Sequence, residues 1–392
     1  MIRLRRRRAR SSGPARVLLA HPSPDLYGSD RMLVESARSL IGAGCVVTVA
    51  LPIDGPLVPV LQQAGAAVVI VETLVLRKSL MSPRGLITLA VSGLRSLPRA
   101  VQIIRTARPD VVYVNTVTIP GWIIAARLAG APVVCHVHEA EDSLPRPIAL
   151  ALHLPLLLAR RILVNSKAAE NGLTVTLPRL ASRIRLLYNG VAAPPQASQL
   201  NVQNGKIHLL LVGRLSPRKG TDVAIAALEG MIGRGLDASL ALVGEVFPGY
   251  EWYERTLREQ VSAAGLESRV DFAGFQGDVW PRFADADIVL VPSRVEPFGN
   301  VAVEAALARR PVIASAVQGL REIVVPGETG VLVAADDPAA IADAVCAMAA
   351  DWPAAREMAE RAHVDALNRF GTKRYADDLM RLLVDAGVVP AT

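Results

Sequence analysis

The sequence predicts an α/β protein of two domains, each built on a parallel sheet with helices on both faces. The chain has 392 residues, which exceeds the usual size of a single hydrophobic core. Short apolar runs alternate with helix-length segments in both halves, as in sheets whose parallel strands are joined by helices. Residues 192–205, rich in Pro, Gln, Ser and Asn, lack apolar periodicity and are expected to be a linker.

Residues 15–191 are the expected N-terminal domain, which opens with a strand, a loop and a helix. The strand is Val17–Ala20, and apolar residues from Leu33 to Ile41 then recur at helical spacing. Further strands are expected at Val46–Leu51, Val68–Val71, Val111–Val114, Val133–Val137, Ile162–Val164 and Ile184–Leu187. This alternation predicts a Rossmann-like, doubly wound sheet.

Residues 206–371 repeat the pattern and are the expected C-terminal domain. Its strands are expected at Ile207–Val212, Ser239–Val243, Val270–Phe272, Ile288–Val291, Pro311–Ala314 and Val331–Val333. A second Rossmann-like unit follows, and the central cleft between the two domains is the expected ligand site. Within residues 372–392, Tyr375, Leu379 and Leu383 have helical spacing and predict a C-terminal helix.

The positive net charge of the chain comes from its N-terminal end. Lys and Arg number 43 against 36 acidic residues, but residues 1–16 hold seven arginines and no acid, so the remainder is neutral. This balance argues against a nucleic-acid partner. Residues 1–14 are expected to be a disordered basic tail, with attraction to anionic lipid as the alternative.

Cysteine content and hydropathy indicate a cytoplasmic protein. Cys45, Cys135 and Cys346 are too few and too widely spaced for a disulfide framework or a zinc site. The basic start is followed by Ser11 to Pro14 rather than by the apolar core of a signal peptide. The longest apolar stretch, Ile148–Ala159, is shorter than the roughly 20 residues that cross a bilayer.

Two motifs in the C-terminal half suggest an anion site. Glu296-Pro297-Phe298-Gly299-Asn300 follows an expected strand and opens a helix, with Pro297 suited to the first helical position, so that the free amides of Phe298, Gly299 and Asn300 would face a ligand. Glu304 shares a helix face with Asn300 and suits sugar or ribose hydroxyls.

The second motif, Gly213 to Gly220, follows the first expected strand of the same half. It carries Arg214 and Lys219, two cations that can neutralise a departing diphosphate, a task that a divalent metal performs elsewhere. Either motif alone fits solvated loop charges or an ordinary helix cap. Their occurrence at neighbouring strand ends favours a shared site.

In order and spacing, these motifs resemble those of the retaining glycosyltransferases of family 4, of group 1 type, which have the GT-B fold. The likeness covers nearly the whole chain. Further segments that carry it are residues 133–139 (ending His138-Glu139), Tyr188-Asn189-Gly190-Val191, Pro292-Ser293 and residues 327–333.

The resemblance implies the roles of individual residues. The implied catalytic residues are His138, Arg214, Lys219 and Glu296, and the implied donor-binding residues are Gly28, Gly213, Gly244, Phe298, Gly299, Asn300 and Glu304. Arg214 and Lys219 would bind the donor diphosphate, and Glu304 the ribose. Glu296 would contact the transferred sugar, and His138 would lie beside the anomeric carbon. The C-terminal helix would cross back to the N-terminal domain.

The resemblance also implies the reaction. A sugar would move from a nucleotide-sugar donor to a hydroxyl acceptor with retention, without a cofactor or catalytic metal, in cell-surface polysaccharide or glycolipid biosynthesis. Three segments depart from the family's commoner pattern, since Tyr27-Gly28-Ser29 and Gln318-Gly319 replace Gly-Gly pairs and Gly244-Glu245-Val246 lacks a second glycine. These departures bear on donor identity and on the first loop.

Other functional classes explain less of the sequence. His136 and His138, with Glu139, Glu141 and Asp142, suggest a metal-dependent hydrolase, but no third His is nearby. Asp285-Ala286-Asp287 resembles a manganese motif but precedes its strand. The Gly-x-Gly-x-x-Gly of a dehydrogenase is missing. A sugar-nucleotide epimerase or hydrolase of the same fold and a non-catalytic sugar-nucleotide-binding protein remain as alternatives.

The region from Thr73 to Pro109 suggests a membrane-facing surface. It has seven basic residues and no acid, interleaved with apolar residues. The basic residues are Arg77, Lys78, Arg84, Arg95, Arg99, Arg105 and Arg108. Such a surface suits an anionic bilayer, although an ordinary covering helix with a solvated basic face is the alternative. The expected partners are a nucleotide-sugar donor and a glycan or lipid-linked acceptor, with peripheral attachment to the inner face of the plasma membrane.

Overall fold

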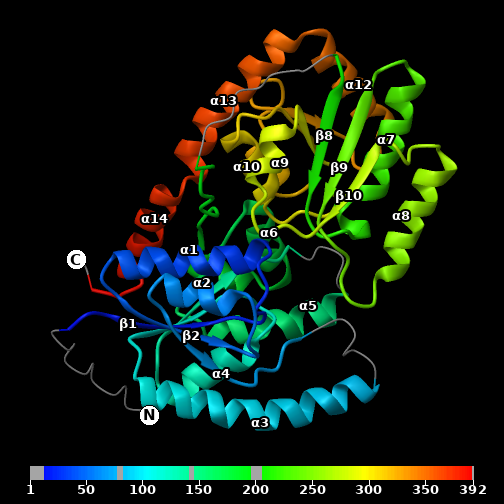
Figure 1. Ribbon diagram of the computed structural model, residues 1–392. Coiled ribbons are helices and arrows are strands. Elements are labelled where there is room, and N and C mark those ends of the chain that lie inside the picture. The colour runs from blue at the N-terminus through cyan, green and yellow to red at the C-terminus, as the bar shows by residue number, and fades with distance from the viewer. Residues whose placement is uncertain (1–12, 77–82, 141–144, 196–204, 391–392) are drawn as a thin grey trace.

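The computed structural model describes residues 13–76, 83–140, 145–195 and 205–390. Two separate parallel sheets form its framework, one of seven strands and one of six, and helices cover both faces of each (Figure 1). The predicted pair of doubly wound α/β domains is therefore confirmed. The basic tail over residues 1–12 and the middle of the expected linker, residues 196–204, lie outside the described residues.

The first sheet has the strand order β3-β2-β1-β4-β5-β6-β7. Its strands are β1 (Arg16–Ala20), β2 (Val46–Leu51), β3 (Ala67–Ile70), β4 (Val111–Val114), β5 (Val133–Val137), β6 (Arg161–Val164) and β7 (Ile184–Leu186). β4 and β5 are buried along their whole length because both faces of the sheet are covered, which explains their apolar sequences. The strand order reverses between β1 and β4, where ligands of such sheets bind.

The second sheet has the order β10-β9-β8-β11-β12-β13 and reverses between β8 and β11. Its strands are β8 (Ile207–Val212), β9 (Ala238–Val243), β10 (Val270–Gly274), β11 (Ile288–Val291), β12 (Val312–Ser315) and β13 (Val331–Val333). All strand pairs in both sheets are parallel. The second switch point carries both anion-site motifs, because one follows β8 and the other follows β11.

Helices connect successive strands and bury an apolar core on each sheet face. With the first sheet come α1 (Gly28–Gly42), α2 (Leu57–Gln63), α3 (Pro83–Ala107), α4 (Pro120–Ala129), α5 (Arg146–His153) and α6 (Lys167–Thr176). With the second come α7 (Thr221–Gly233), α8 (Glu251–Ala263), α9 (Trp280–Asp285), α10 (Asn300–Leu307), α11 (Leu320–Ile323), α12 (Pro338–Ala350) and α13 (Trp352–Phe370). Short 3-10 helices cover Leu154–Leu158, Pro178–Arg183 and Pro217–Lys219.

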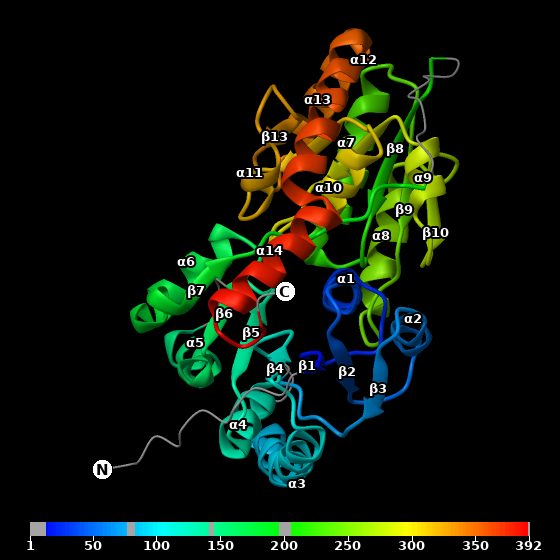
Figure 2. The same ribbon diagram turned by 90° about the vertical axis from the view of Figure 1, so that its left-hand side faces the viewer.

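The last helix, α14 (Thr372–Asp385), leaves the second sheet and packs beside α1 on the first (Figure 2). Its side chains Tyr375, Leu379 and Leu383 are fully buried in the core of the first sheet. The hydroxyls of Tyr375 and Ser36 are 2.7 Å apart. The helical spacing of these three residues is thus explained by a helix that packs its apolar face against the N-terminal domain.

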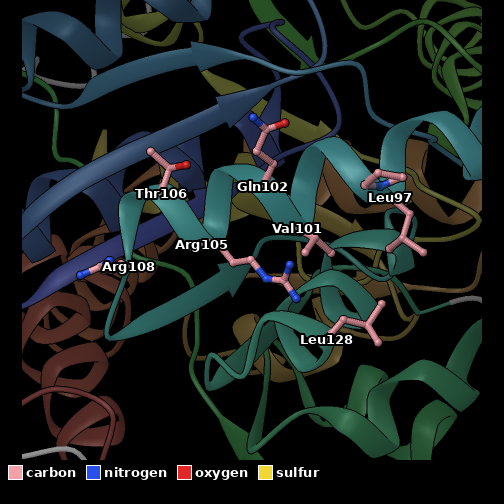
Figure 3. A pocket seen from close by; sticks show the side chains of 8 residues that line it. Leu97, Val101, Gln102, Arg105, Thr106, Arg108 and Leu128 are labelled. Atoms are coloured by element: carbon pink, nitrogen blue, oxygen red, sulfur yellow. The ribbon is translucent and has the colours of Figure 1, made fainter.

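Helix α3 lies on the outer face of the first sheet, at the end of the molecule farthest from the second sheet (Figure 1). A surface pocket of about 810 Å³ lies between α3 and α4 (Figure 3). Its lining residues are Leu97, Pro98, Val101, Gln102, Arg105, Thr106, Arg108 and Leu128. Arg77 and Lys78 lie outside the described residues. Within the described chain, the helices lack the combination of length and hydropathy that a bilayer span requires.

Removing a buried side chain of α14 is expected to destabilise the N-terminal domain. In Leu379→Ala the lost packing and the resulting cavity should lower the free energy of unfolding by about 2–5 kcal/mol. Chemical denaturation measures the change, with the exposed Asp377→Ala on the same helix as control. Equal stability of the two variants would contradict the docking of α14 onto the first sheet.

Candidate functional site

The candidate residues follow the carboxyl ends of strands at the switch points of both sheets. His21 follows β1, Asn115 follows β4 and His138 follows β5, while Gly213 follows β8, Gly244 follows β9 and the segment from Pro292 to Gly299 follows β11. In a parallel sheet these ends share one edge, so residues distant in sequence come together there. Contacts between the two edges join the domains at this place.

Two glycines shape the loop after β8. Gly213 and Gly244 have φ values of +141° and +144°, which side chains rarely adopt. A Cβ atom on Gly244 would lie 2.0 Å from the carbonyl oxygen of Gly213, so the two loops touch backbone to backbone. The loop then continues into the 3-10 turn Pro217–Lys219, which carries Lys219.

Lys219 forms an ion pair with Glu296 at the edge of the second sheet. Glu296 is 9% exposed, and the Ser293 hydroxyl donates a 3.2 Å hydrogen bond to the same carboxylate oxygen that Lys219 contacts. The pair brings the motif after β8 into direct contact with the motif after β11. Two predicted catalytic residues are thus adjacent, one cationic and one anionic.

Glu304 lies one turn along α10 and faces the N-terminal domain. Its side chain is 9% exposed, and its carboxylate lies 3.4 Å from the guanidinium of Arg31 on α1. Burial raises the pKa of Glu304, while the nearby charges of Arg31 and Lys219 lower it. Arg31 is an addition to the residues predicted from sequence. Its only sequence signal is its place three residues after Gly28.

Helix α10 begins later than predicted. Its first residue is Asn300 and Gly299, with φ +120°, is the N-cap, so the expectation of Pro297 at the first helical position was wrong. Gly299 sets the boundary because a Cβ there would lie 2.6 Å from Leu320. The amides at the start of the helix therefore belong to Gly299, Asn300 and Val301, since the first N–H groups of a helix have no intrahelical partner.

The side chains around this helix start are placed differently from one another. Phe298 is buried against Tyr188 and Phe370, so only its backbone can line a ligand site. Asn300 accepts a 2.8 Å hydrogen bond from Asn189, which precedes the crossing to the second domain. A Cβ on Gly28 would lie 3.2 Å from the side-chain nitrogen Nδ2 of Asn300, so the first loop closely approaches α10.

Arg214 is stacked between aromatic rings from the two domains. Its guanidinium carbon lies 3.7 Å from the ring centre of Tyr27 and 3.1 Å from that of Phe247. Tyr27 in turn lies against Phe275, with ring centres 5.5 Å apart. Tyr27 belongs to the segment expected to depart from the family's Gly-Gly pair, and its ring gives Arg214 a cation–π contact across the domain interface.

Gln318 is another point where the departure from Gly-Gly has a structural consequence. Its φ is +33°, and its side chain accepts a 2.9 Å hydrogen bond from the Glu296 amide. The same side chain donates a 3.1 Å hydrogen bond to the carbonyl of Ala140, two residues after His138. Gln318 therefore links the segment that carries Glu296 to the segment that carries His138.

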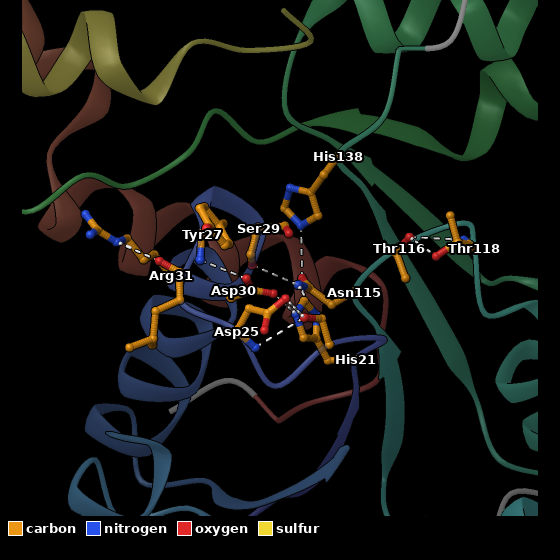
Figure 4. A network of polar contacts seen from close by, with 12 residues as sticks. His21, Asp25, Tyr27, Ser29, Asp30, Arg31, Asn115, Thr116, Thr118 and His138 are labelled. Atoms are coloured by element: carbon orange, nitrogen blue, oxygen red, sulfur yellow. Dashed lines mark hydrogen bonds and ion pairs between the residues drawn. The ribbon is translucent and has the colours of Figure 1, made fainter. Parts of the chain in front are cut away.

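His138 ends a chain of buried polar side chains in the first sheet (Figure 4). Its Nε2 lies 3.0 Å from Asn115 Oδ1, Asn115 Nδ2 lies 3.1 Å from His21 Nδ1, and His21 Nε2 lies 2.7 Å from Asp30 Oδ1. The His138 ring also lies 4.0 Å from that of His136. Burial, with the neighbouring histidines, holds the pKa of His138 well below its usual range, so the ring is neutral at pH 7.

The surroundings of the two alternative metal motifs point to structural roles. Tyr113 OH and His136 Nδ1 are 2.7 Å apart, and Glu139 accepts hydrogen bonds from Thr116 and from the His138 amide. Asp287 accepts a 2.7 Å hydrogen bond from the His208 amide at the amino end of β11. Among the described residues, which leave out Glu141 and Asp142, no group of three His, Cys, Asp or Glu could hold a metal ion.

Comparison with protein families matches both halves of the chain. Residues 27–193 match the model described as "Glycosyltransferase Family 4", and residues 194–365 match "Glycosyl transferases group 1". The chain is 32% identical over 279 residues to glycogen synthase of Mycobacterium tuberculosis, which covers 66% of this chain and 64% of the synthase. It is 33% identical to D-inositol 3-phosphate glycosyltransferase of an Arthrobacter species, over 47% and 44% of the two chains. The matched segments thus span less than two thirds of these relatives.

Solved structures resemble the chain over nearly its full length. The Anabaena protein HepE in complex with UDP-glucose has a TM-score of 0.81 and 25% identity, covering 94% of this chain and 99% of HepE. Sucrose-phosphate synthase of Thermosynechococcus elongatus has a TM-score of 0.76 and 21% identity, covering 95% and 98%, and shares the fold. The two-domain arrangement of this chain is therefore that of the GT-B fold.

The buried histidines predict how stability depends on pH. Burial lowers the pKa of His136 to about 3, so the unfolded chain takes up a proton near pH 6.5 that the folded chain resists. The contribution of such a histidine to stability should be constant above that pH and fall below it, by about 1.4 kcal/mol per pH unit. Denaturation at pH 7, 6 and 5 should show a smaller loss in His136→Gln than in the parent. An equal loss in both would assign the effect to other groups.

Proposed function

Because the chain belongs to the group 1 glycosyl transferases and has their family 4 N-terminal domain, we propose that it moves a sugar from a nucleotide-sugar donor to a hydroxyl acceptor with retention of configuration. The observation that carries this proposal is the ion pair of Lys219 with Glu296 beside the start of α10. It brings a cation, a helix N-terminus and two carboxylates to one edge of the second sheet.

The leaving group is a nucleoside diphosphate, whose developing charge needs positive groups close by. Lys219 and the first amides of α10 supply a cation and the positive end of a helix dipole, as anion sites of this kind do. Arg214 lies in the same loop and adds a second cation. We propose that these groups replace a divalent ion in stabilising the departing diphosphate.

The two carboxylates have separate roles in this proposal. Glu304 gives up its ion pair with Arg31 and accepts hydrogen bonds from the ribose hydroxyls. Glu296 accepts hydrogen bonds from hydroxyls of the transferred sugar. The bond from the anomeric carbon to the phosphate oxygen breaks, and the acceptor oxygen bonds to that carbon on the same face. The acceptor's proton passes to the departing phosphate, so atoms and charge balance. His138 lies on the opposite side of the site, in the N-terminal domain.

The donor proposed is a uridine diphosphate sugar. The support is the likeness to Anabaena HepE, whose structure holds UDP-glucose. A sugar-nucleotide epimerase or hydrolase of the same fold would isomerise or release the sugar without a carbohydrate acceptor. A non-catalytic binding protein would return the donor unchanged. Product analysis of labelled donor with and without glycan or lipid-linked acceptors distinguishes these cases.

Loss of Lys219 is expected to abolish most transfer. Removing its charge from the leaving group should lower kcat about 100- to 1,000-fold in Lys219→Ala, the effect of deleting one preorganised electrostatic group. Radiolabelled donor and an acceptor panel provide the assay. The control is Arg218→Ala, which removes an exposed cation from the same loop and should change kcat less than about two-fold. Near-normal turnover in Lys219→Ala would refute the proposed site.

The acceptor is proposed to be lipid-linked, with the protein held at an anionic membrane. The support is the basic outer surface of α3, where Arg95 and Arg105 are exposed. Near an anionic surface each such residue contributes about 1 kcal/mol of attraction. With such an acceptor, the transfer would be a step in the biosynthesis of a cell-surface polysaccharide or glycolipid.

Co-sedimentation with vesicles tests this attachment. The protein should pellet with anionic vesicles at low salt and not with neutral ones, because the attraction is screened by ions. The double variant Arg95→Ala/Arg105→Ala should bind the vesicles about 30-fold more weakly. The control Arg255→Ala/Arg356→Ala, which removes two exposed arginines from the other domain, should behave as the parent. Parental pelleting of both variants would show that α3 is not the contact surface.

A further inference from the structure

A continuous chain of hydrogen bonds runs from helix α1 to His138. It passes from Asp30 through His21 and Asn115, all of which are at most 3% exposed, to the ring of His138 (Figure 4). The four side chains come from α1 and from the ends of β1, β4 and β5. The motif analysis singled out only His138 among them, and the proposed reaction assigns no role to the other three.

The Asp30 carboxylate fixes which atoms donate and which accept along this chain of hydrogen bonds. An ionised Asp30 can only accept hydrogen bonds, and its Oδ2 accepts from the Tyr27 amide at 2.8 Å. Its Oδ1 lies 2.7 Å from His21 Nε2, so Nε2 must carry a proton and donate it. Because a neutral imidazole has one N–H, His21 Nδ1 is then an acceptor.

The orientation of the Asn115 side-chain amide gives the same donor and acceptor roles for an independent reason. Asn115 Nδ2 lies 3.1 Å from His21 Nδ1 and also donates to the backbone carbonyl of Ser29 at 3.4 Å. A carbonyl only accepts, so the Ser29 contact requires the amide nitrogen to face α1, which agrees with an acceptor at His21 Nδ1. The Asn115 oxygen therefore faces His138, whose Nε2 lies 3.0 Å away and must donate.

The remaining ring nitrogen of His138 is left as an acceptor. Its Nδ1 atom is buried, and no group among the described residues lies within hydrogen-bond distance of it. A buried lone pair without a partner is costly, and a ligand group that donates a hydrogen bond to it would remove this cost. In Figure 4 this nitrogen lies on the side of the ring away from Asn115.

We propose that Asp30, His21 and Asn115 are positioning residues that hold His138 as its Nε2–H tautomer, so that its Nδ1 accepts a hydrogen bond from a hydroxyl of the substrate. The inference rests on the proposed function, which places His138 beside the transferring sugar. Control of a histidine tautomer by a buried carboxylate through a hydrogen bond is an established device in enzymes. Here the control acts through one further histidine and one amide.

Asp30→Asn keeps the shape of the side chain but should reverse the donor and acceptor roles along the chain of hydrogen bonds. The new amide oxygen must still accept from the Tyr27 amide, which turns the NH2 group toward His21 Nε2. His21 then carries its proton on Nδ1, and the Asn115 amide turns over, giving up its long 3.4 Å hydrogen bond to Ser29 in exchange for a matched contact with His21. His138 becomes the Nδ1–H tautomer. A donor replaces the acceptor, so kcat should fall about 10- to 100-fold, the cost of one mismatched buried hydrogen bond.

Nitrogen-15 NMR of histidine-labelled protein reads the tautomer directly and independently of activity. The parent at pH 7 should show His138 as Nε2–H, identified by loss of its signals in His138→Gln, and Asp30→Asn should show it as Nδ1–H. The control Asp110→Asn makes the same exchange at the opposite end of β4, where Asp110 contacts the Arg16 amide, and should leave tautomer and kcat unchanged.

Each outcome decides the proposal. A parent spectrum with His138 as Nδ1–H or as imidazolium overturns it, even if Asp30→Asn does not fold. A folded Asp30→Asn with parental tautomer and kcat also overturns it, whereas an inverted tautomer with lowered kcat and an unchanged Kd for UDP supports it. If the parent transfers no sugar and does not bind UDP, the proposed function is wrong. The NMR spectra would still show whether Asp30 controls the tautomer of His138.

Discussion

The pairing of Lys219 with Glu296 beside the start of α10 is the interaction on which the proposed chemistry depends. A diphosphate leaving group carries more negative charge than most protein sites can accept, and the protein meets it with fixed positive groups at one sheet edge. Each cation there has an acidic or aromatic partner before donor binds: Lys219 has Glu296, Arg31 has Glu304 and Arg214 has Tyr27. The site thus holds three cations against two carboxylates, and a donor must exchange these contacts for its own.

The same contacts join the two domains, so donor binding and domain position are coupled. Arg31 and Tyr27 belong to the first domain, while Glu304 and Arg214 belong to the second. Glu322 of the second domain adds a contact away from the site, since it accepts hydrogen bonds from the amides of Lys167 and Ala168 at the start of α6. The chain passes between the domains twice, after Val191 and after Phe370. These two places lie side by side, because the Val191 amide donates a hydrogen bond to the carbonyl of Phe370 at 2.8 Å. Hinge motion of such domains would make or break these contacts together.

The fold could be predicted because buried parallel strands have short apolar sequences that local pattern alone reveals. The start of α10 was placed wrongly because Pro297 is a good first helical residue, whereas Gly299 is the cap for a reason that only packing against Leu320 shows. Arg31 and Asn115 were missed because each is a single polar residue without a repeating pattern. A rule that inspects the residue after every expected strand would have found His21, Asn115 and His138 together. The cross-domain contacts of Gln318 depend on a domain orientation that sequence patterns do not contain.

The most direct test of the metal-free electrostatic site is a crystal structure of the protein with bound UDP, grown once with magnesium and once with a chelator. The phosphates should lie within hydrogen-bond distance of Lys219 Nζ and of the amides of Gly299 and Asn300 in both crystals, with the ribose at Glu304. Phosphates bound away from these groups, or held there only through a coordinated cation, would contradict the proposed site.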